Sequence, residues 1–195
     1  MKKLYCFDFD GTITYSDTMF LFLRHYNASK FYFQFTKHIP LFILLRLGLM
    51  DAERVKKSFI SSILKGETKS RIGKQAQKFF DENYPKIIRK NALDFIRNRD
   101  LEKTESLLIT ASLDIWTKPF AEKFGMKLLA TRAEFKNEVF TGNFIGPNCN
   151  GVEKLNRIKE EVQGRKYDKT IAFGDTAGDR PMLNWAHEGH FRFFH

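Results

Sequence analysis

Four carboxylates in two short segments are the side chains of this sequence best suited to chemistry. Asp8 and Asp10 lie in the segment FDFDGT, and Asp175 and Asp179 lie in the segment GDTAGD. Residues two apart in an extended strand share a face, so the first two carboxylates would repel each other in a partly buried cleft. A hard divalent ion such as Mg²⁺ would compensate and would bring phosphate with it. The first segment alone fits an acidic strand-to-turn exit equally well, but the two together supply a ligand set that no single turn explains.

Three apolar runs are predicted to be strands that bring polar residues to a common edge. The second run, Ser106–Ile109, is followed by the small polar residues Thr110 and Ser112. A helix-like segment comes after this run, and another comes after the third run. Parallel strands that alternate with helices end at one edge of a sheet, where ligands of such folds bind. Asp8, Thr110 and Asp175 can therefore meet in an α/β fold with a parallel sheet. The predicted strands are Lys3–Phe9, Ser106–Ile109 and Thr170–Phe173, and the predicted helices are Leu113–Phe124, stopped by Gly125, and Arg180–Ala186.

Nearly a hundred residues separate the first two predicted strands, far more than a crossover requires. The excess carries helical patterning, so we predict an inserted α-helical cap over residues 15–84, with Pro85 at its exit. Residues 1–14 and 85–195 then form the core. The core is expected to contain a helix over Ile87–Arg99, strand pairs within Leu128–Phe144, a helix over Gly151–Val162 and a short final strand within Gly189–His195.

Composition sets the outer limits on the fold and its setting. The chain has 195 residues, of which 43% are hydrophobic and 29% charged, which suits one core domain with a modest insert and excludes wholesale disorder. The net charge of +10 favours anionic ligands. Cys6 and Cys149 form no CxxC or Cys/His cluster, and the N-terminus does not resemble a signal peptide, so a reduced cytoplasmic chain is expected. The most apolar run, Ile39–Met50, is too short to span a membrane, and Arg46 interrupts it.

Four segments, in order, resemble the four motifs of the haloacid dehalogenase (HAD) superfamily. The segments DFDGT (8–12) and GDTAGD (174–179) resemble the first and fourth motifs, and ITAS (109–112) looks like the second. CNGVEK (149–154) is similar to the lysine-bearing third motif of the phosphoserine-phosphatase-like branch, subfamily IB. The motifs span almost the whole chain, whereas the cap matches only by position and helical character. The resemblance implies a Rossmann-like three-layer core with the cap inserted after the first strand.

The resemblance also implies roles for the first two carboxylates. Asp8 would attack phosphorus and form an aspartyl-phosphate that water later cleaves, with Mg²⁺ between the carboxylate and the phosphate. Asp10 would protonate the leaving oxygen and then accept a proton from the attacking water, while its backbone carbonyl ligates the ion. Dehalogenases of the superfamily lack an acid at this position and ion-pumping ATPases have Thr, so Asp10 indicates a phosphatase or a phosphomutase.

Phosphate-binding donors are expected at the ends of the first two strands. The motif match assigns the Thr110 hydroxyl to a phosphate oxygen, together with the backbone amides of Gly11 and Ala111. On composition alone, Thr110 and Ser112 both precede a predicted helix, and capping by Ser112 is the favoured alternative to catalysis.

Three more residues receive roles from the third and fourth motifs. Lys154 would neutralise the nucleophile and bind the phosphate, although a lysine near the start of an amphipathic helix is ordinarily a solvated surface residue. Asp175 is expected to ligate the metal together with Asp8. Asp179 is expected to hold a metal-bound water or Lys154 rather than to ligate directly.

Substrate recognition is where the sequence departs from phosphoserine phosphatases. Asp17 roughly occupies the position of an acidic substrate-binding residue of that branch. The stretch KKSFISSILKG (56–66) resembles the region that should carry an arginine, but it has Phe59, Ile60 and Ser61 there. We therefore do not expect phosphoserine to be the substrate.

The first half of the predicted cap is basic and aromatic. No acidic residue occurs between Thr18 and Met50. Packing of a helical cap on itself is the favoured interpretation, and a surface for a phosphate ester with an apolar tail at an anionic membrane is the alternative. The residues concerned are Arg24, Lys30, Lys37 and Arg46 with Phe20, Phe22, Tyr26, Phe31, Tyr32, Phe33, Phe35 and Phe42.

The sequence as a whole predicts a cytoplasmic Mg²⁺-dependent phosphatase that acts on a small phosphomonoester. A phosphomutase and a lipid-phosphate phosphatase at a membrane surface are the alternatives among enzymes. A basic nucleic-acid-binding module is the alternative outside enzymes, but no binding motif accompanies the charge, so no nucleic-acid partner is expected.

Overall fold

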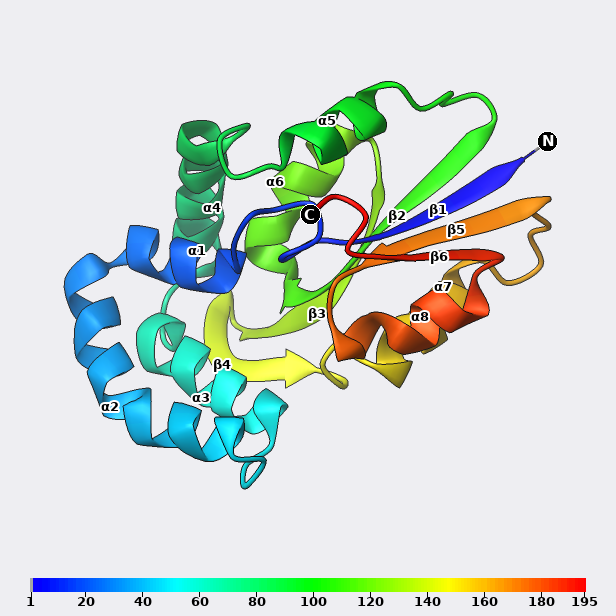
Figure 1. Cartoon of the computed structure of the whole chain (residues 1–195). Coiled ribbons are helices and arrows are strands. Elements are labelled where there is room, and N and C mark those ends of the chain that lie inside the picture. Colours follow the sequence, from blue (N-terminus) through cyan, green and yellow to red (C-terminus); the bar gives the residue numbers. More distant parts are fainter. Residues whose placement is uncertain (1) are drawn as a thin grey trace.

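The chain folds around a six-stranded sheet whose central strand carries Asp8. The computed structural model describes residues 2–195, so Met1 of the expected core lies outside the described residues. The strand order is β4-β3-β2-β1-β5-β6 (Figure 1). All neighbouring strands are parallel except β3 and β4, so the predicted α/β fold with a parallel sheet is confirmed, with one antiparallel edge strand. The strands are β1 Lys3–Asp8, β2 Thr104–Leu113, β3 Lys127–Lys136, β4 Val139–Ile145, β5 Lys169–Gly174 and β6 Glu188–Phe191.

Helices cover both faces of the sheet and give the core three layers (Figure 1). Along β1, Leu4 and Cys6 are fully buried in the cluster that contains Ile158 of α7. Phe7 points to the opposite face and joins the cluster that contains Trp116 of α6. A strand covered on both faces needs an unbroken apolar run, which is what β1 has. The core helices are α5 Lys90–Arg97, α6 Asp114–Phe124, α7 Val152–Glu161 and α8 Arg180–Trp185.

Four of the five helices between β1 and β2 lie in the segment predicted to be a cap. The chain enters and leaves this segment through an antiparallel bridge between Thr14 and Ile88. The Tyr15 amide donates to the Ile87 carbonyl at 2.9 Å, on the same pair of segments. The entry and exit of the insert are therefore fastened together a few residues beyond Asp10. The helices are α1 Thr18–Tyr26, α2 Ala28–Arg46, α3 Ala52–Leu64 and α4 Lys69–Asn83.

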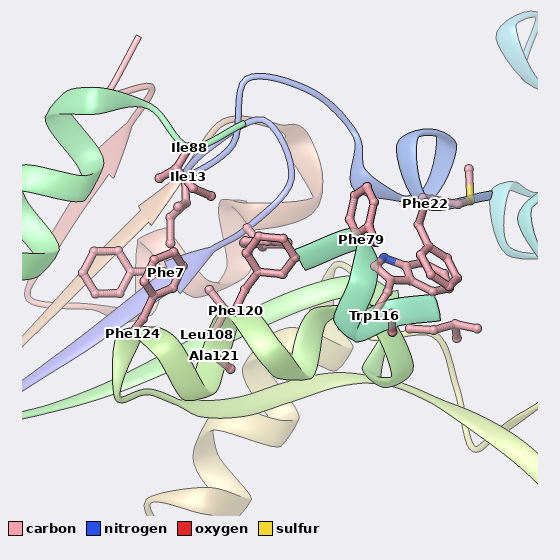
Figure 2. Close-up of a cluster of buried hydrophobic side chains, with 14 of the residues drawn as sticks. Phe7, Ile13, Phe22, Phe79, Ile88, Leu108, Trp116, Phe120, Ala121 and Phe124 are labelled. Atoms are coloured by element: carbon pink, nitrogen blue, oxygen red, sulfur yellow. The ribbon is translucent and has the colours of Figure 1, made fainter. Parts of the chain in front are cut away.

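Aromatic side chains join these helices to the core. Phe22 of α1 stacks on Trp116 of α6, with ring centroids 5.1 Å apart. Phe79 of α4 lies between Phe22 and Phe120 of α6, at centroid distances of 5.6 and 6.1 Å (Figure 2). These rings place α1 and α4 against α6, close to the end of the central strand.

Backbone hydrogen bonds attach the turn between α3 and α4 to the β3–β4 hairpin. The Gly66 amide donates to the Phe140 carbonyl at 3.0 Å, and the Phe140 amide donates back to the Glu67 carbonyl at 2.9 Å. The hairpin thus extends from the core sheet to the far end of α3, and α3 is held at both ends.

Two predicted features differ in the structure. Ser112 does not cap α6, because β2 continues to Leu113 and the Ser112 hydroxyl donates to Asp10 at 2.7 Å. The expected helix over Ile87–Arg99 is α5, which begins only at Lys90. Residues Ile87–Arg89 instead form backbone bonds with the entry segment of the insert.

Most of the phenylalanines serve as core. Phe22, Phe31 and Phe59 are buried, and Phe20, Phe35 and Phe42 pack against the same cluster. Tyr32 and Phe33 are exceptions, with 56% and 58% of their surfaces exposed. The self-packing interpretation thus holds for the inner side of these helices and fails for the outer side of α2. Within residues 2–195, no helix is both long enough and apolar enough to cross a membrane.

The aromatic cluster around Phe59 predicts a large, position-specific loss of stability. Phe59 is fully buried and contacts the rings of Phe20, Phe31 and Phe42, so Phe59→Ala leaves a cavity and should lower the free energy of unfolding by about 3–5 kcal/mol. Phe33→Ala removes the same ring from an exposed position and should change it by less than about 0.5 kcal/mol. Denaturant unfolding of both variants measures the difference. Equal losses would contradict the assignment of an inner and an outer side.

Candidate active site

Asp8 ends the central strand and is buried at the meeting point of three segments. Its side chain accepts a hydrogen bond from the Thr12 hydroxyl at 2.8 Å and one from the Lys154 ammonium at 2.5 Å. Burial raises the pKa of Asp8 to about 7, and the positive charge of Lys154 only partly opposes this. A further cation beside Asp8 would favour the ionised form, which is the nucleophilic one.

Lys154 connects two carboxylates. It lies in the first turn of α7, is 3% exposed, and its Nζ is 2.5 Å from Asp8 Oδ1 and 2.6 Å from Asp179 Oδ1. Burial disfavours the ammonium form, but the two carboxylates more than offset this and raise the pKa of Lys154. Burial likewise opposes ionisation of Asp179, yet Lys154 lowers the pKa of Asp179 below its usual value. Lys154 is therefore charged at the centre of the site, unlike the solvated lysine of the alternative interpretation.

Asp179 is fixed by its own loop. Its Oδ2 accepts hydrogen bonds from the Asp175 amide at 3.1 Å and from the Thr176 amide at 3.0 Å, and also from the Thr176 hydroxyl. Gly174 is required at the end of β5, because a Cβ there would collide with the Asp179 side chain. Both oxygens of Asp179 are engaged, so this residue positions Lys154 and the loop.

The carboxylates of Asp8, Asp175 and Asp179 offer a donor set suited to a hard cation. One oxygen from each lies within 4.8 Å of the others. Within the described part of the chain, the Thr12 hydroxyl, 3.1 Å away, is the one donor near the Asp175 carboxylate, and its single proton is shared with Asp8, 2.8 Å away, which leaves Asp175 able to take a metal. Oxygen ligands at this spacing fit Mg²⁺. Asp179 Oδ2 accepts three hydrogen bonds from its own loop, whereas the Thr12 hydroxyl is the one donor near Asp8 Oδ2 and Asp175 Oδ1 in the described part of the chain. Asp8 and Asp175 are therefore the side chains that fit the ion.

Asp10 points away from that cluster and toward the helical insert. Its Oδ1 accepts from both the amide and the hydroxyl of Thr18, at 2.7 and 2.6 Å. Its Oδ2 accepts from the hydroxyls of Thr110 and Ser112, at 3.0 and 2.7 Å. The carboxylate is thus held by the first residue of α1 on one side and by the end of β2 on the other. The predicted metal contact of Asp10 through its backbone carbonyl stays a prediction.

The expected phosphate donors lie at the site but have partners of their own. The Thr110 hydroxyl donates to Asp10, so contact with a phosphate oxygen requires this bond to be exchanged. The Gly11 amide donates to the Thr14 hydroxyl at 3.1 Å rather than to an open position. Ala111 lies where the ladder between β2 and β3 shifts register, next to Thr110.

Two features of the backbone at position 11 require glycine. Its φ of +83° is unfavourable for other residues, and a Cβ would come within 2.5 Å of Asp175 Oδ2. Its carbonyl accepts from Arg89 Nε at 3.2 Å and contacts His195 Nε2 at 3.0 Å. The loop that follows Asp10 can therefore pass directly beside the Asp175 carboxylate.

Lys56 is a site residue that sequence reasoning missed. It lies in the first half of α3, and its Nζ donates to the Ala111 carbonyl at 2.6 Å. Burial lowers the pKa of Lys56, whereas the nearby charges of Asp17 and Asp10 oppose that shift. The sequence shows Lys56 only as one lysine in a Lys-rich stretch, and this pattern is also typical of a solvated helix surface. The packing of α3 on the core brings this lysine to the catalytic edge.

Asp17 lies close to Lys56, but it already has a structural role. It is the N-cap of α1, and its Oδ1 accepts from the Met19 amide at 2.8 Å. Desolvation of its carboxylate by neighbouring groups, together with repulsion from Asp10, raises the pKa of Asp17 to about 6, although the residue as a whole is exposed. Its predicted contact with substrate stays a prediction.

The buried ion triad predicts a pH-dependent loss of stability when Lys154 is replaced. Lys154→Met strands two buried carboxylates and should lower the free energy of unfolding by about 3–5 kcal/mol at neutral pH. Loss of the ammonium removes the charge that opposes burial at both carboxylates, so the folded-state pKa of Asp8 rises further above its unfolded value of about 3.9, and the pKa of Asp179 rises as well. The folded variant then binds more protons than the unfolded chain, so its deficit relative to the wild type should grow as the pH rises from about 5 to about 8.

Urea unfolding of Lys154→Met at several pH values measures this deficit. Lys159→Met, an exposed lysine of the same helix, serves as the control and should show little change at any pH. A deficit for Lys154→Met that is independent of pH would contradict the assigned ion triad.

Comparison with known proteins agrees with this geometry. The model of the family described as haloacid dehalogenase-like hydrolase matches residues 6–184. The protein CicA of Caulobacter vibrioides is 32% identical over 195 residues, which cover 98% of this chain and 86% of CicA. A protein of unknown function from Bordetella pertussis Tohama I has the same fold with a TM-score of 0.83, at 20% identity, over 95% of this chain and 87% of its own.

A substrate-bound phosphoserine phosphatase also shares the fold. Its TM-score is 0.65 at 22% identity, and the match covers 95% of this chain and 83% of the phosphatase. A phospho-aspartyl intermediate analogue of phosphoserine phosphatase matches with a TM-score of 0.62. From the family match, the identity to CicA and the three-layer architecture, we conclude that the chain belongs to the HAD superfamily of hydrolases, with the fold of its phosphoserine-phosphatase-like branch.

Proposed function

We propose that the chain is a Mg²⁺-dependent phosphatase that hydrolyses a phosphomonoester through an aspartyl-phosphate on Asp8. The observation that carries the proposal is the contact of Asp8 with Lys154 within a cluster of three carboxylates. A phosphate dianion needs positive charge at the attacking carboxylate, and this cluster is built to hold it. The structural likeness to phosphoserine phosphatases supports the same reaction class.

In the first half-reaction, the Asp8 carboxylate attacks phosphorus and the bond from phosphorus to the leaving oxygen breaks. Asp10 gives a proton to that oxygen. In the second half-reaction, Asp10 takes a proton from water as the water attacks phosphorus, and inorganic phosphate leaves with Asp8 restored. One carboxyl group thus serves as acid and then as base. The four hydrogen bonds from Thr18, Thr110 and Ser112 hold the ionised form in place, and the protonated form must exchange one of them to direct its proton to the leaving oxygen.

Positive charge at the reacting phosphate would come from two sources. Mg²⁺ held by Asp8, Asp175 and the Asp10 carbonyl would supply charge neutralisation between the nucleophile and the phosphate. Lys154 keeps its ammonium beside Asp8 and can share it with a phosphate oxygen. Asp179 holds Lys154 in that position throughout.

The leaving-group side differs from that expected of a phosphoserine phosphatase. Phe59 and Ile60 are fully buried, and the Ser61 hydroxyl donates to the Gly142 carbonyl, so the three positions where an arginine is expected offer no cation to a substrate. Lys56, one turn earlier on α3, supplies a cation instead. We therefore propose a substrate whose leaving group carries an anionic or strongly polar group, held by Lys56, other than phosphoserine. A cytoplasmic location belongs to the same proposal and is supported by the two buried free thiols, Cys6 and Cys149.

Hydrolysis of p-nitrophenyl phosphate tests the proposed reaction without a choice of natural substrate. The wild type should release p-nitrophenol with Mg²⁺ and lose this activity with EDTA, because the carboxylate cluster then lacks its counter-charge. Asp8→Asn should fall by at least about 10³-fold, since the amide cannot attack phosphorus. Asp81→Asn, which alters an exposed carboxylate on α4, should behave as the wild type. Equal rates for Asp8→Asn and the wild type would reject Asp8 as the nucleophile.

Replacement of Lys56 tests the leaving-group side separately. Lys56→Met should raise KM for anionic phosphate esters by about ten- to a hundredfold and change kcat less, because binding rather than bond cleavage loses its cation. Lys57→Met removes a neighbouring lysine of the same helix and is the matched control. Steady-state kinetics on a panel of phosphate esters, with p-nitrophenyl phosphate included, gives both parameters. A Lys56→Met variant that loses kcat on every ester with KM unchanged would show that Lys56 supports the catalytic machinery and not substrate recognition.

A further inference from the structure

The outer side of α2 is apolar and has no partner within residues 2–195. α2 is the helix at the outer edge of the molecule in Figure 1, with α3 between it and the sheet. Its inner side packs through Phe31, Phe35 and Phe42 against the aromatic cluster. Its outer side exposes six large apolar side chains, which we call the α2 outer face: Tyr32, Phe33, Ile39, Ile43, Leu44 and Leu47. The apolar side of a helix ordinarily packs against another surface, and within residues 2–195 nothing covers this one.

The α2 outer face occupies one side of the helix, where the exposed Thr36 lies among its apolar residues, and has basic residues on both borders. At about 100° per residue, its six positions fall within an arc of about 140°. Lys37 and Arg46 follow about 20° beyond its two edges, and both are exposed. The Lys37 ammonium lies 4.2 Å from the centre of the Phe33 ring, so its stem runs alongside the apolar face. Exposed Leu49, in the turn after α2, extends the same apolar character.

Charge decides which kind of surface can cover this face. From Thr18 to Met50 the sequence has basic residues and no acidic ones. A second copy of the chain, docked face to face, would set Lys37 and Arg46 against the same cations of its partner. An anionic lipid bilayer offers apolar chains to the face and negative headgroups to its borders, which is the pattern of helices that lie in a membrane interface.

We propose that the α2 outer face docks on an anionic lipid surface, with α2 lying in the plane of the interface. Leu47 and Leu49 lie between α2 and α3, and α3 carries Lys56 to the catalytic edge. A docked α2 therefore holds the insert, and with it one wall of the active site, at the bilayer. This docking does not depend on the proposed phosphatase reaction, because it uses none of the catalytic residues.

Co-sedimentation of the full chain with vesicles tests the proposal. The wild type should bind phosphatidylcholine vesicles that contain phosphatidylglycerol, and bind pure phosphatidylcholine far less. Ile43→Ser with Leu47→Ser should weaken binding by at least about tenfold, because the two apolar side chains no longer enter the bilayer. Lys37→Gln with Arg46→Gln should weaken it about thirtyfold, because two charges are removed from the borders.

Matched controls separate the face from the overall charge and from folding. Leu101→Ser removes an exposed apolar side chain from the loop between α5 and β2, and Lys159→Gln with Lys166→Gln removes two exposed charges far along the chain from α2. Both controls should bind vesicles as the wild type does. All α2 variants should keep wild-type hydrolysis of p-nitrophenyl phosphate, and Asp8→Asn should keep wild-type vesicle binding, so a failure of docking and a failure of the phosphatase proposal are distinguishable.

Three outcomes would overturn the proposal. The first is no binding of the wild type to anionic vesicles at low salt. The second is an equal loss of binding in the lysine control and in the Lys37→Gln, Arg46→Gln variant, which would show non-specific attraction of a basic protein. The third is a stable dimer in solution that the Ile43→Ser, Leu47→Ser variant dissociates while vesicle binding is unchanged, which would assign the face to self-association.

Discussion

The contact of one buried ammonium with two buried carboxylates constrains the whole catalytic edge. Lys154 compensates Asp8 and Asp179, and each member of this triad comes from a different part of the chain. Removing charged groups from water is costly, so the triad is tolerable only if β1, α7 and the loop after β5 are aligned closely enough for contacts of about 2.6 Å. The parallel sheet supplies that alignment, because it brings the carboxyl ends of β1 and β5 side by side. The three carboxylates still exceed the single ammonium, and this excess is what makes the cluster a site for a cation.

A second network ties the helical insert to the proposed acid and base. Asp10 accepts two hydrogen bonds from Thr18, the first residue of α1, and the Thr18 hydroxyl accepts one from Trp116 Nε1 at 3.2 Å. Trp116 in turn stacks on Phe22, so the position of α1 and the position of Asp10 are set by the same contacts. A displacement of α1 relative to α6 would therefore release one side of Asp10. The insert thus takes part in the geometry of the site and does more than cover it.

How much of the fold and of the candidate site the sequence predicts depends on how far apart in the chain the interacting residues lie. Strand ends could be located because an apolar run that stops at Asp8 or at Gly174 is a local pattern, and the order of four motifs brought the right loops together. The partners of hydroxyl groups could not be located, since Ser112 next to a helix has the local pattern of a cap whether or not a buried carboxylate is within reach. Lys56 was missed for the same reason, because its contact with Ala111 depends on how α3 packs on a strand 55 residues away. Both Ser112 and Lys56 have partners that lie far away in the sequence, and nothing in the residues around them indicates those partners.

The helix α2 shows that the sequence also leaves open which apolar residues are buried. Its apolar residues occur on both sides of the helix, and such a pattern does not distinguish the side that packs on the core from the side that stays exposed. The structure divides the two: Phe31, Phe35 and Phe42 turn inward, and the α2 outer face remains exposed beside Lys37 and Arg46. Exposed apolar surface is costly in water, and a core helix gains nothing from large residues on its wet side. The apolar residues of α2 therefore have two places in the structure: a buried cluster that fastens the insert to the core, and an exposed face for which we propose a lipid surface as the cover.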